Sequence, residues 1–350
     1  MIVSWLLFLI LSRPSFGLDA VPAAAWVVPW DPVSLAPDSP LDCFDEINPF
    51  VFALDREHRV SLAYPKLAQA LFKRGRPGQL NIPVVVNDVI DSGGKVLALK
   101  SISAVSLILA SPQRISAHVA ELVKAAEGFD GIEVDYERVP YPLWGRYIRL
   151  LEELAVALHA RGLRLHVDLE AGMLYGLGEP YARRYWPMLA AHADRVKLMC
   201  YYERGAYSDA VGPGNSLVWV ERTASKALEL IPAAKLSLAL SLSGSDWQVP
   251  WPKIPGLRRM ERLHYGRVLA LADRHRSRIV WDHEKSSPYF TYTRKNTLHE
   301  VWFEDERSFY EKIKAVRTAG VQNVSLWYLG AKHPDLESLG LCRGQTLSGR

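Results

Sequence analysis

The sequence predicts a (β/α)8 barrel that carries a small α+β insertion between its seventh strand and its last helix. Three observations support this fold class. Eight short apolar runs have the character of strands, amphipathic helical patterns separate most of them, and 350 residues suffice for one α/β barrel with insertions. The strand candidates span residues 24–30, 47–54, 81–87, 131–136, 163–169, 195–201, 235–242 and 323–328.

The helices between these strands show apolar residues at intervals of three and four positions. Clear patterns span residues 115–127, 144–161, 182–192, 218–230 and 306–319. Gly162 and Gly320 directly follow two of these patterns, as expected of glycines that end helices. Strands that alternate with helices form parallel sheets covered by those helices, which is the layout of an α/β barrel.

The chain lengthens between the seventh strand and the last helix, over about residues 243–304, in a stretch rich in Trp, Pro, Tyr and His. Its strand-like runs lie at 277–281, 289–292 and 299–303. We interpret this stretch as an insertion at the carboxyl end of the barrel, where barrel enzymes build their active sites. The predicted organisation is a signal segment at 1–17, a barrel domain at 22–334 and a tail at 335–350.

The composition is that of an ordinary globular protein, with 49% hydrophobic residues, 23% charged residues and a net charge of +4. The small net charge and the lack of a dense Lys/Arg run do not indicate nucleic-acid binding. Residues 1–17 contain one apolar run that resembles a short secretory signal and is too short to span a bilayer. We expect an exported protein, periplasmic or extracellular, without an integral membrane segment in the mature chain; a wrongly assigned start is the alternative.

The three cysteines, Cys43, Cys200 and Cys342, fit neither a disulfide framework nor a zinc motif. Cys200 lies in an apolar strand and is expected to be a buried thiol. A bridge between Cys43 and Cys342 is left open. No metal or cofactor is expected, and we expect a monomer.

Residues 129–137 alternate acidic and apolar side chains. In a strand, this alternation places Glu133, Asp135 and Glu137 on one face, about 7 Å apart at successive positions. Acids crowded in this way repel one another, so at least one is expected to keep its proton near neutral pH. A protonated carboxylic acid beside an ionised one is the equipment of glycoside hydrolysis. A solvated edge strand is the alternative, but the position among strand–helix units favours a barrel mouth.

Residues 130–137, DGIEVDYE, resemble the DGxDxDxE signature of family-18 glycoside hydrolases, the chitinase-like barrels. Four further features match the family in sequence order, and one of them resembles the branch of spore-cortex and peptidoglycan N-acetylglucosaminidases. They are MCYY at 199–202, SLSGSDW at 241–247, PYF at 288–290 with HEVWFED at 299–305, and VSLWYLG at 324–330. The resemblance implies the barrel fold and a glycosidase that retains the anomeric configuration.

The resemblance also implies roles for individual residues. Glu137 would protonate the glycosidic oxygen, while the substrate's own 2-acetamido oxygen attacks the anomeric carbon. Asp135 would accept a hydrogen bond from the acetamido N–H and stabilise the developing positive charge. Tyr201 would hydrogen-bond the acetamido oxygen, and Trp327 would form an apolar floor under the sugar. Met199 joins the substrate-binding residues, with core packing as its simpler interpretation.

Two positions depart from the family's pattern. Glu133 stands where Asp or Asn is usual, and its extra methylene must rearrange the contact with Asp135. Tyr202 replaces the Asp that normally follows the sixth-strand Tyr. Both residues are still assigned to substrate binding. Glu203 follows directly, but strand alternation points it the other way unless the strand has ended.

The predicted fifth strand is unusually polar. His166, Asp168 and Glu170 alternate along it and are expected to share one inward face. These residue types could bind a metal. A buried hydrogen-bonded network that serves the active-site acids is the favoured interpretation.

The leading hypothesis is an exported hydrolase that cleaves β-1,4 bonds in glycans containing N-acetylglucosamine, namely chitin oligomers or peptidoglycan. The glycan is the expected partner. The alternative is a lectin-like barrel with weak or no catalysis, because Glu133 and Tyr202 break the family's pattern. A third hypothesis is a barrel enzyme for another sugar, with Asp168 or Glu170 as the nucleophile of a two-carboxylate mechanism.

Overall fold

The computed structural model describes residues 22–31, 40–72, 77–205, 208, 210–249, 260–330, 336, 339 and 341. The predicted signal segment at 1–17 and most of the predicted tail at 335–350 lie outside these ranges. Within them, no helix is long and apolar enough to cross a membrane.

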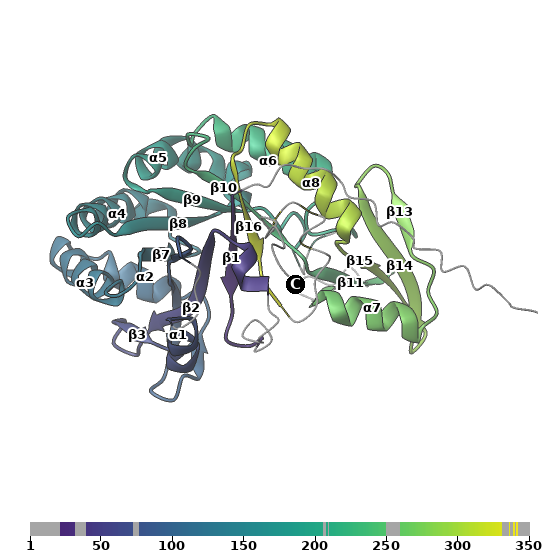
Figure 1. The fold of residues 1–350 in the computed structure, drawn as a ribbon, viewed down its shortest axis with the longest axis horizontal. Coiled ribbons are helices and arrows are strands. Elements are labelled where there is room, and N and C mark those ends of the chain that lie inside the picture. Colours follow the sequence, from purple (N-terminus) through teal and green to yellow (C-terminus); the bar gives the residue numbers. More distant parts are fainter. Residues whose placement is uncertain are drawn as a thin grey trace, which may run out of the picture.

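Eight parallel strands of the described chain close into a barrel (Figure 1). The ring closes because β16 pairs with both β10 and β1, while β5 pairs with both β2 and β7. The barrel strands are β1 Ala23–Val27, β2 Glu46–Leu54, β5 Val84–Ile90, β7 Gly131–Asp135, β8 Arg164–Glu170, β9 Arg195–Met199, β10 Leu236–Ser241 and β16 Asn323–Trp327. They confirm the predicted fold class and each predicted strand, with ends shifted by a few residues.

Helices cover the outside of the barrel (Figure 1). They are α1 Pro65–Phe72, α2 Ile102–Ile108, α3 Pro112–Ala125, α4 Trp144–His159, α5 Glu179–His192, α6 Leu217–Leu228 and α8 Glu306–Thr318. The five predicted helices correspond to α3, α4, α5, α6 and α8, whereas the short helices α1 and α2 were not predicted. Capping contacts mark the starts of α3 and α8. The Ser111 side chain accepts the N–H of Arg114 at the start of α3, and Asp305 forms a capping box with Ser308 at the start of α8.

Three short strands extend the sheet beyond the barrel ring. They are β3 Val60–Leu62 and β4 Leu80–Asn81, which pair with β2, and β6 Val96–Ala98, which pairs with β5. The strand β6 is antiparallel to β5, so the chain turns back over the end of the barrel before it enters α2. This return carries Lys100 to the barrel mouth.

The insertion forms an antiparallel sheet with one helix beside the barrel (Figure 1). Its elements are β11 Gly244–Val249, β12 Met260–Leu263, α7 Tyr265–Arg274, β13 Val280–Asp282, β14 Ser287–Arg294 and β15 Thr297–Trp302. Side chains of α7 and the sheet, including Val268, Phe290 and Val301, pack into a core of their own. The predicted α+β insertion is therefore confirmed, although β11, β12 and α7 were not foreseen as separate elements.

Side-chain alternation in the strands divides the barrel into an outer core and a polar interior. On β7, Ile132 and Val134 belong to the core formed with the surrounding helices. The intervening Glu133 and Asp135 have the opposite orientation and point inward. Cys200 is buried and free, as expected. Cys43 is disulfide-bonded, and Cys342 lies outside the described residues.

Candidate active site

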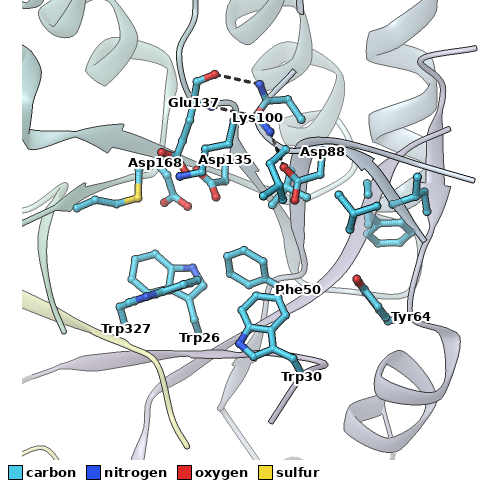
Figure 2. A pocket seen from close by; sticks show the side chains of 18 of the residues that line it. Trp26, Trp30, Phe50, Tyr64, Asp88, Lys100, Asp135, Glu137, Asp168 and Trp327 are labelled. Atoms are coloured by element: carbon cyan, nitrogen blue, oxygen red, sulfur yellow. Dashed lines mark hydrogen bonds and ion pairs between the residues drawn. The ribbon is translucent and has the colours of Figure 1, made fainter. Parts of the chain in front are cut away.

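A cavity of about 290 Å³ opens at the carboxyl end of the barrel strands (Figure 2). Acidic side chains and one lysine lie on one side of it, and aromatic rings lie on the other. The predicted site residues that line it are Asp135, Glu137, Met199, Tyr201, Tyr202 and Trp327. The remaining predicted site residue, Glu133, is not part of this lining.

The backbone of Glu137 is fixed by a side chain from the neighbouring strand β5. Asn87 Nδ2 donates to the Glu137 carbonyl at 2.9 Å, and Asn87 Oδ1 accepts the Glu137 N–H at 3.1 Å. The next residue, Arg138, has a φ of 60°, and its N–H donates to Glu170 Oε2 at 3.1 Å. These contacts turn the chain directly after β7, so that the Glu137 side chain lines the cavity.

An ion pair joins Glu137 to the Lys100 ammonium (Figure 2). Lys100 is positioned in turn by Asp88, whose Oδ1 accepts the Lys100 N–H at 2.7 Å. Burial raises the pKa of Glu137, and the positive charge of Lys100 offsets this only in part. The negative charges of Glu170 and Asp88 also raise this pKa. The net effect raises the pKa of Glu137, which is the direction that the role of a general acid requires.

The neighbouring acid, Asp135, is 6% exposed, and its Oδ1 accepts no hydrogen bond from any described group. Burial raises its pKa well above the usual range, and the charges of Glu137 and Glu133 raise it further against the opposing effect of Lys100. A buried oxygen without a donor is costly in a folded protein. Asp135 is therefore free to accept a hydrogen bond from a ligand that enters the cavity.

Aromatic rings form the floor opposite these acids (Figure 2). Trp327, at the end of β16, stacks on Tyr201 with ring centres 5.9 Å apart and planes at 12°. It makes edge contacts with Trp26 at 5.6 Å and Phe50 at 5.2 Å. Trp30 is 55% exposed and continues the aromatic surface toward solvent. Broad apolar ring faces of this kind suit the apolar faces of pyranose sugars.

Tyr202 lies at the rim of the cavity and is 47% exposed. Its ring centre is 5.9 Å from Lys100 Nζ and 5.5 Å from the Arg262 guanidinium. Since β9 has ended at Met199, strand alternation no longer governs Glu203. Glu203 Oε2 accepts the N–H of Ser216 at 2.6 Å, ahead of α6, so Glu203 does not replace the missing carboxylate in the cavity.

Glu133 is fully buried, and its contacts are to the protein. Its Oε1 accepts from Trp26 Nε1 at 2.5 Å, and its Oε2 accepts from Asn48 Nδ2 at 2.8 Å and from Lys197 Nζ at 2.5 Å. The structure thus places Glu133 in the barrel interior, where it holds Trp26 of the aromatic floor. Direct contact with a ligand in the cavity is not supported for this residue.

Glu133 belongs to a buried ionic group of four side chains, which we call the lower cluster: Glu46, Glu133, His166 and Lys197. Lys197 Nζ lies 2.7 Å from Glu46 Oε1, which also accepts from His166 Nδ1 at 3.1 Å. Burial alone would raise the pKa of Glu46, but the charges of His166 and Lys197 lower it well below the usual value. Among the described residues, Glu46, Glu133 and His166 are close enough to share a metal ion. Here the Lys197 ammonium neutralises the two carboxylates.

The three polar residues of the fifth barrel strand, β8, have separate surroundings. His166 joins the lower cluster, in agreement with the predicted network. Asp168 is 4% exposed and lines the cavity, and neither of its carboxyl oxygens accepts a hydrogen bond from a described group. Glu170 bonds the backbone of Arg138 and is not among the residues that line the cavity. We call Asp135, Glu137 and Asp168 the upper cluster.

Sequence reasoning missed several residues that shape the site. Asn87, in the middle of β5, and Lys197, within β9, are polar residues in strands that were expected to be buried, and this was a usable signal. Lys100 follows a short rim strand, and no local pattern predicts its ion pair with Glu137. Trp26 and Phe50 were indistinguishable from core residues.

Residues 100–331 match the family described as "Glycosyl hydrolases family 18". The chain is 27% identical over 207 residues to the putative sporulation-specific glycosylase YdhD of Bacillus subtilis (strain 168), across 59% of this chain and 48% of YdhD. It is 28% identical over 220 residues to the cortical fragment-lytic enzyme of the same organism, across 61% of this chain and 50% of that enzyme. These matches span about half the length of the two relatives.

Among solved structures, a chitinase from Chromobacterium violaceum superposes with a TM-score of 0.76 at 24% identity, over 95% of this chain and 100% of the chitinase. That likeness concerns the fold. The closed barrel, with carboxyl groups at the end of its fourth strand and an aromatic floor, has the architecture of a barrel glycosidase. Because the family match extends over well more than half of the sequence, the chain belongs to glycosyl hydrolase family 18.

Proposed function

We propose that this chain is a retaining glycosidase that cleaves β-1,4 bonds next to N-acetylglucosamine by substrate-assisted catalysis. The observation that carries the proposal is the pair Glu137 and Asp135, which face one cavity with raised pKa values, opposite an aromatic floor. A raised pKa brings Glu137 closer to the protonated state from which a general acid delivers its proton to a leaving group.

In the first step, Glu137 gives its proton to the glycosidic oxygen as the bond from that oxygen to the anomeric carbon breaks. The carbonyl oxygen of the substrate's 2-acetamido group bonds to the anomeric carbon and forms an oxazolinium ion. Asp135 accepts the acetamido N–H and stabilises the positive charge. In the second step, Glu137 takes a proton from water as the water opens the oxazolinium, so the configuration is retained.

The other cavity residues would bind and orient the sugar. Trp327 provides a flat apolar floor, and Tyr201, stacked on it, would direct its hydroxyl to the acetamido oxygen. Met199 and Tyr202 line the same cavity and would contact the substrate. Glu133 would act indirectly, through its hydrogen bond to Trp26.

A two-carboxylate mechanism is less well supported. Burial and the charges of Glu133 and Asp135 raise the pKa of Asp168 well above the usual range, and a neutral carboxyl group is a poor nucleophile. Glu170 is committed to the Arg138 N–H. Neither residue offers the ionised, freely placed carboxylate that this mechanism needs.

The names of the relatives, a cortical fragment-lytic enzyme, a glycosylase and a chitinase, support peptidoglycan or chitin oligomers as the proposed glycan. Export of the protein is part of the proposal. The disulfide at Cys43 supports it, because disulfides persist mainly in oxidising compartments.

The experiment compares the wild-type protein with Glu137→Gln on chitooligosaccharides and on purified peptidoglycan. We expect the wild type to release products and Glu137→Gln to lose about 10²–10⁴-fold in rate, the range for removal of a general acid–base. Binding, measured by calorimetry, should persist in the variant. Glu152→Gln, an exposed change on α4, is the matched control and should leave the rate unchanged.

Two results would contradict the proposal. If the wild type binds these glycans and cleaves none of them, the lectin-like alternative holds. If it cleaves an analogue that lacks the acetamido group at a comparable rate, the substrate does not supply the nucleophile, and a two-carboxylate mechanism replaces the one proposed.

A further inference from the structure

The cavity of the candidate active site extends beyond the groups that the proposed mechanism uses. Its lining also includes six residues that we call the side arm: Phe52, Ala53, Tyr64, Ile90, Val96 and Leu99. Figure 2 shows Tyr64 at one end of the cavity and Trp327 of the aromatic floor at the other. The side arm is therefore continuous with the proposed sugar site, but its far end lies away from that site.

Strand pairing brings the side arm together where β3 and β6 extend the sheet beyond the barrel ring. Phe52, on β2, pairs with Leu62, which precedes Tyr64 by two residues. Ile90, the last residue of β5, pairs with Val96, the first residue of β6. Because β2 and β5 are neighbours in the ring, these residues form the walls of one arm.

The side arm presents apolar side chains to solvent. Leu99 is 67% exposed and Val96 is 39% exposed, whereas Ala53 and Ile90 are buried. A ligand that covers such apolar surface removes it from water, and this is favourable when the ligand is itself apolar. The side arm therefore favours an apolar group.

The side arm holds few groups that could satisfy a second sugar ring. Its own polar group is the Tyr64 hydroxyl, and Asp88 lines the cavity close to it. Asp88 Oδ1 already accepts the Lys100 N–H at 2.7 Å. A pyranose carries hydroxyl groups on most of its carbons, and each loses hydrogen bonds to water when it enters an apolar cavity. An alkyl or aryl group has no such cost.

The side arm begins beside the proposed proton donor. Lys100, which forms the ion pair with Glu137, directly follows Leu99 in the chain. Asp88 positions Lys100, and its charge adds to the effect of burial in raising the pKa of Tyr64. In the proposed function, Glu137 faces the glycosidic oxygen. The aglycone, which is the group beyond that oxygen, is therefore directed toward the side arm.

We propose that the side arm binds an alkyl or aryl aglycone, so that this chain also removes N-acetylglucosamine from glycosides whose leaving group is apolar. The inference rests on the proposed function, because Glu137 protonates the same glycosidic oxygen. The bond from the anomeric carbon to that oxygen breaks, and the aglycone leaves as an alcohol that carries the proton from Glu137. Water then opens the oxazolinium ion and releases N-acetylglucosamine.

The first experiment measures kcat/KM for the methyl, butyl and hexyl β-glycosides of N-acetylglucosamine. Their alcohols are leaving groups of similar reactivity, so differences among them report contacts of the chain. We expect kcat/KM to rise about three- to fourfold for each CH₂ that the side arm covers. A value that does not change with chain length would overturn the inference.

The second experiment changes the side arm itself. Val96→Asn combined with Leu99→Asn should bring the ratio of kcat/KM for the hexyl and methyl glycosides toward one. Leu97→Asn is the matched control, because Leu97 is 43% exposed on the same strand but is not part of the cavity lining. It should leave the ratio unchanged. If the double variant lowers cleavage of chitobiose as much as that of the hexyl glycoside, the side arm binds a sugar and the inference is wrong.

The third experiment does not need cleavage. Calorimetry with Glu137→Gln should show that the hexyl glycoside binds at least about tenfold more tightly than the methyl glycoside, with a more negative heat-capacity change, the mark of apolar burial. The two Asn substitutions should remove this difference. Equal affinities in Glu137→Gln would overturn the inference. If the wild type cleaves none of the glycosides, the proposed function fails, and these affinities still report whether the side arm binds an apolar group.

Discussion

The lower and upper clusters meet on strands β7 and β8, where Glu133 and His166 lie one inward step from Asp135 and Asp168, and their surroundings are opposite. In the lower cluster, Glu46 and Glu133 share Lys197 and accept hydrogen bonds from Asn48. In the upper cluster, Asp135 Oδ1 and both oxygens of Asp168 have no described donor. Successive inward-pointing residues of one strand are only about 7 Å apart.

This difference shows how one barrel interior separates stability from chemistry. In the lower cluster, the charges of His166 and Lys197 overcome the effect of burial and lower the pKa of Glu46 well below its usual value. In the upper cluster, burial and neighbouring negative charges raise the pKa values of Asp135 and Asp168, and Asp135 Oδ1 remains open to a ligand. The lower cluster therefore supports the barrel, and the upper cluster performs the proposed reaction at a cost in stability.

The comparison predicts a large loss of stability for Lys197→Met. The change leaves Glu46 and Glu133 buried without their shared cation, and breaking a buried pair in this way costs about 3–5 kcal/mol in the free energy of unfolding. Denaturant unfolding at pH 7 measures this loss. The control is Lys226→Met, which breaks a partly exposed pair with Glu179 and should cost about 1 kcal/mol or less.

The pH dependence of that loss follows from the direction of the pKa shift. The lowered pKa of Glu46 contributes stability to the wild type above its usual pKa, and this contribution is lost as the pH falls through the folded-state pKa. In Lys197→Met, the unpaired acids are most costly when ionised. The free energies of unfolding of the wild type and Lys197→Met should therefore differ most near pH 7 and less at acidic pH. A difference that does not change with pH would show that Lys197 acts through packing alone.

Asp135→Asn should separate activity from stability. We expect a loss in rate of about 10²-fold or more, the scale of removing a charge-stabilising group. The raised pKa of Asp135 means that ionising it destabilises the fold; this cost is absent below its usual pKa and grows as the pH rises toward the folded-state pKa. The variant should therefore be at least as stable as the wild type at pH 7. An unchanged rate would refute the proposed role. A marked loss of stability would mean that Asp135, like the residues of the lower cluster, stabilises the barrel.

The barrel could be predicted from the sequence because each strand and each long helix carries its own periodic signal. The strand at 131–136 is the clearest case, since its alternation both identifies the strand and places Asp135 inside the barrel. The short helices α1 and α2 have too few turns for such a signal. In the insertion, the strand β11 pairs with β15 about fifty residues later, a contact that no local pattern reveals.

The site was predictable where one motif held its residues and obscure where several strands contribute. Glu137 and Asp135 lie in one short signature, and the family's pattern pointed to Tyr201 and Trp327. Glu133 was assigned to substrate binding, because the sequence does not show that Lys197, on another strand, neutralises it. The same limit applies to Lys100, which reaches Glu137 only because β6 folds back over the barrel mouth.

Of the predicted effects, we expect the smallest from Lys100→Met, which removes the positive charge beside Glu137 of the upper cluster. Burial already raises the pKa of Glu137, and the Lys100 charge opposes that rise. Without Lys100, the pKa of Glu137 should rise further, so the acid stays protonated to higher pH and the basic limb of the kcat/KM profile should move upward. Lys95→Met, an exposed change on the same rim segment, should leave the profile in place. If the acidic limb moves upward and the basic limb does not, Glu137 acts mainly as a base in the measured step, which would reverse the role given to its proton.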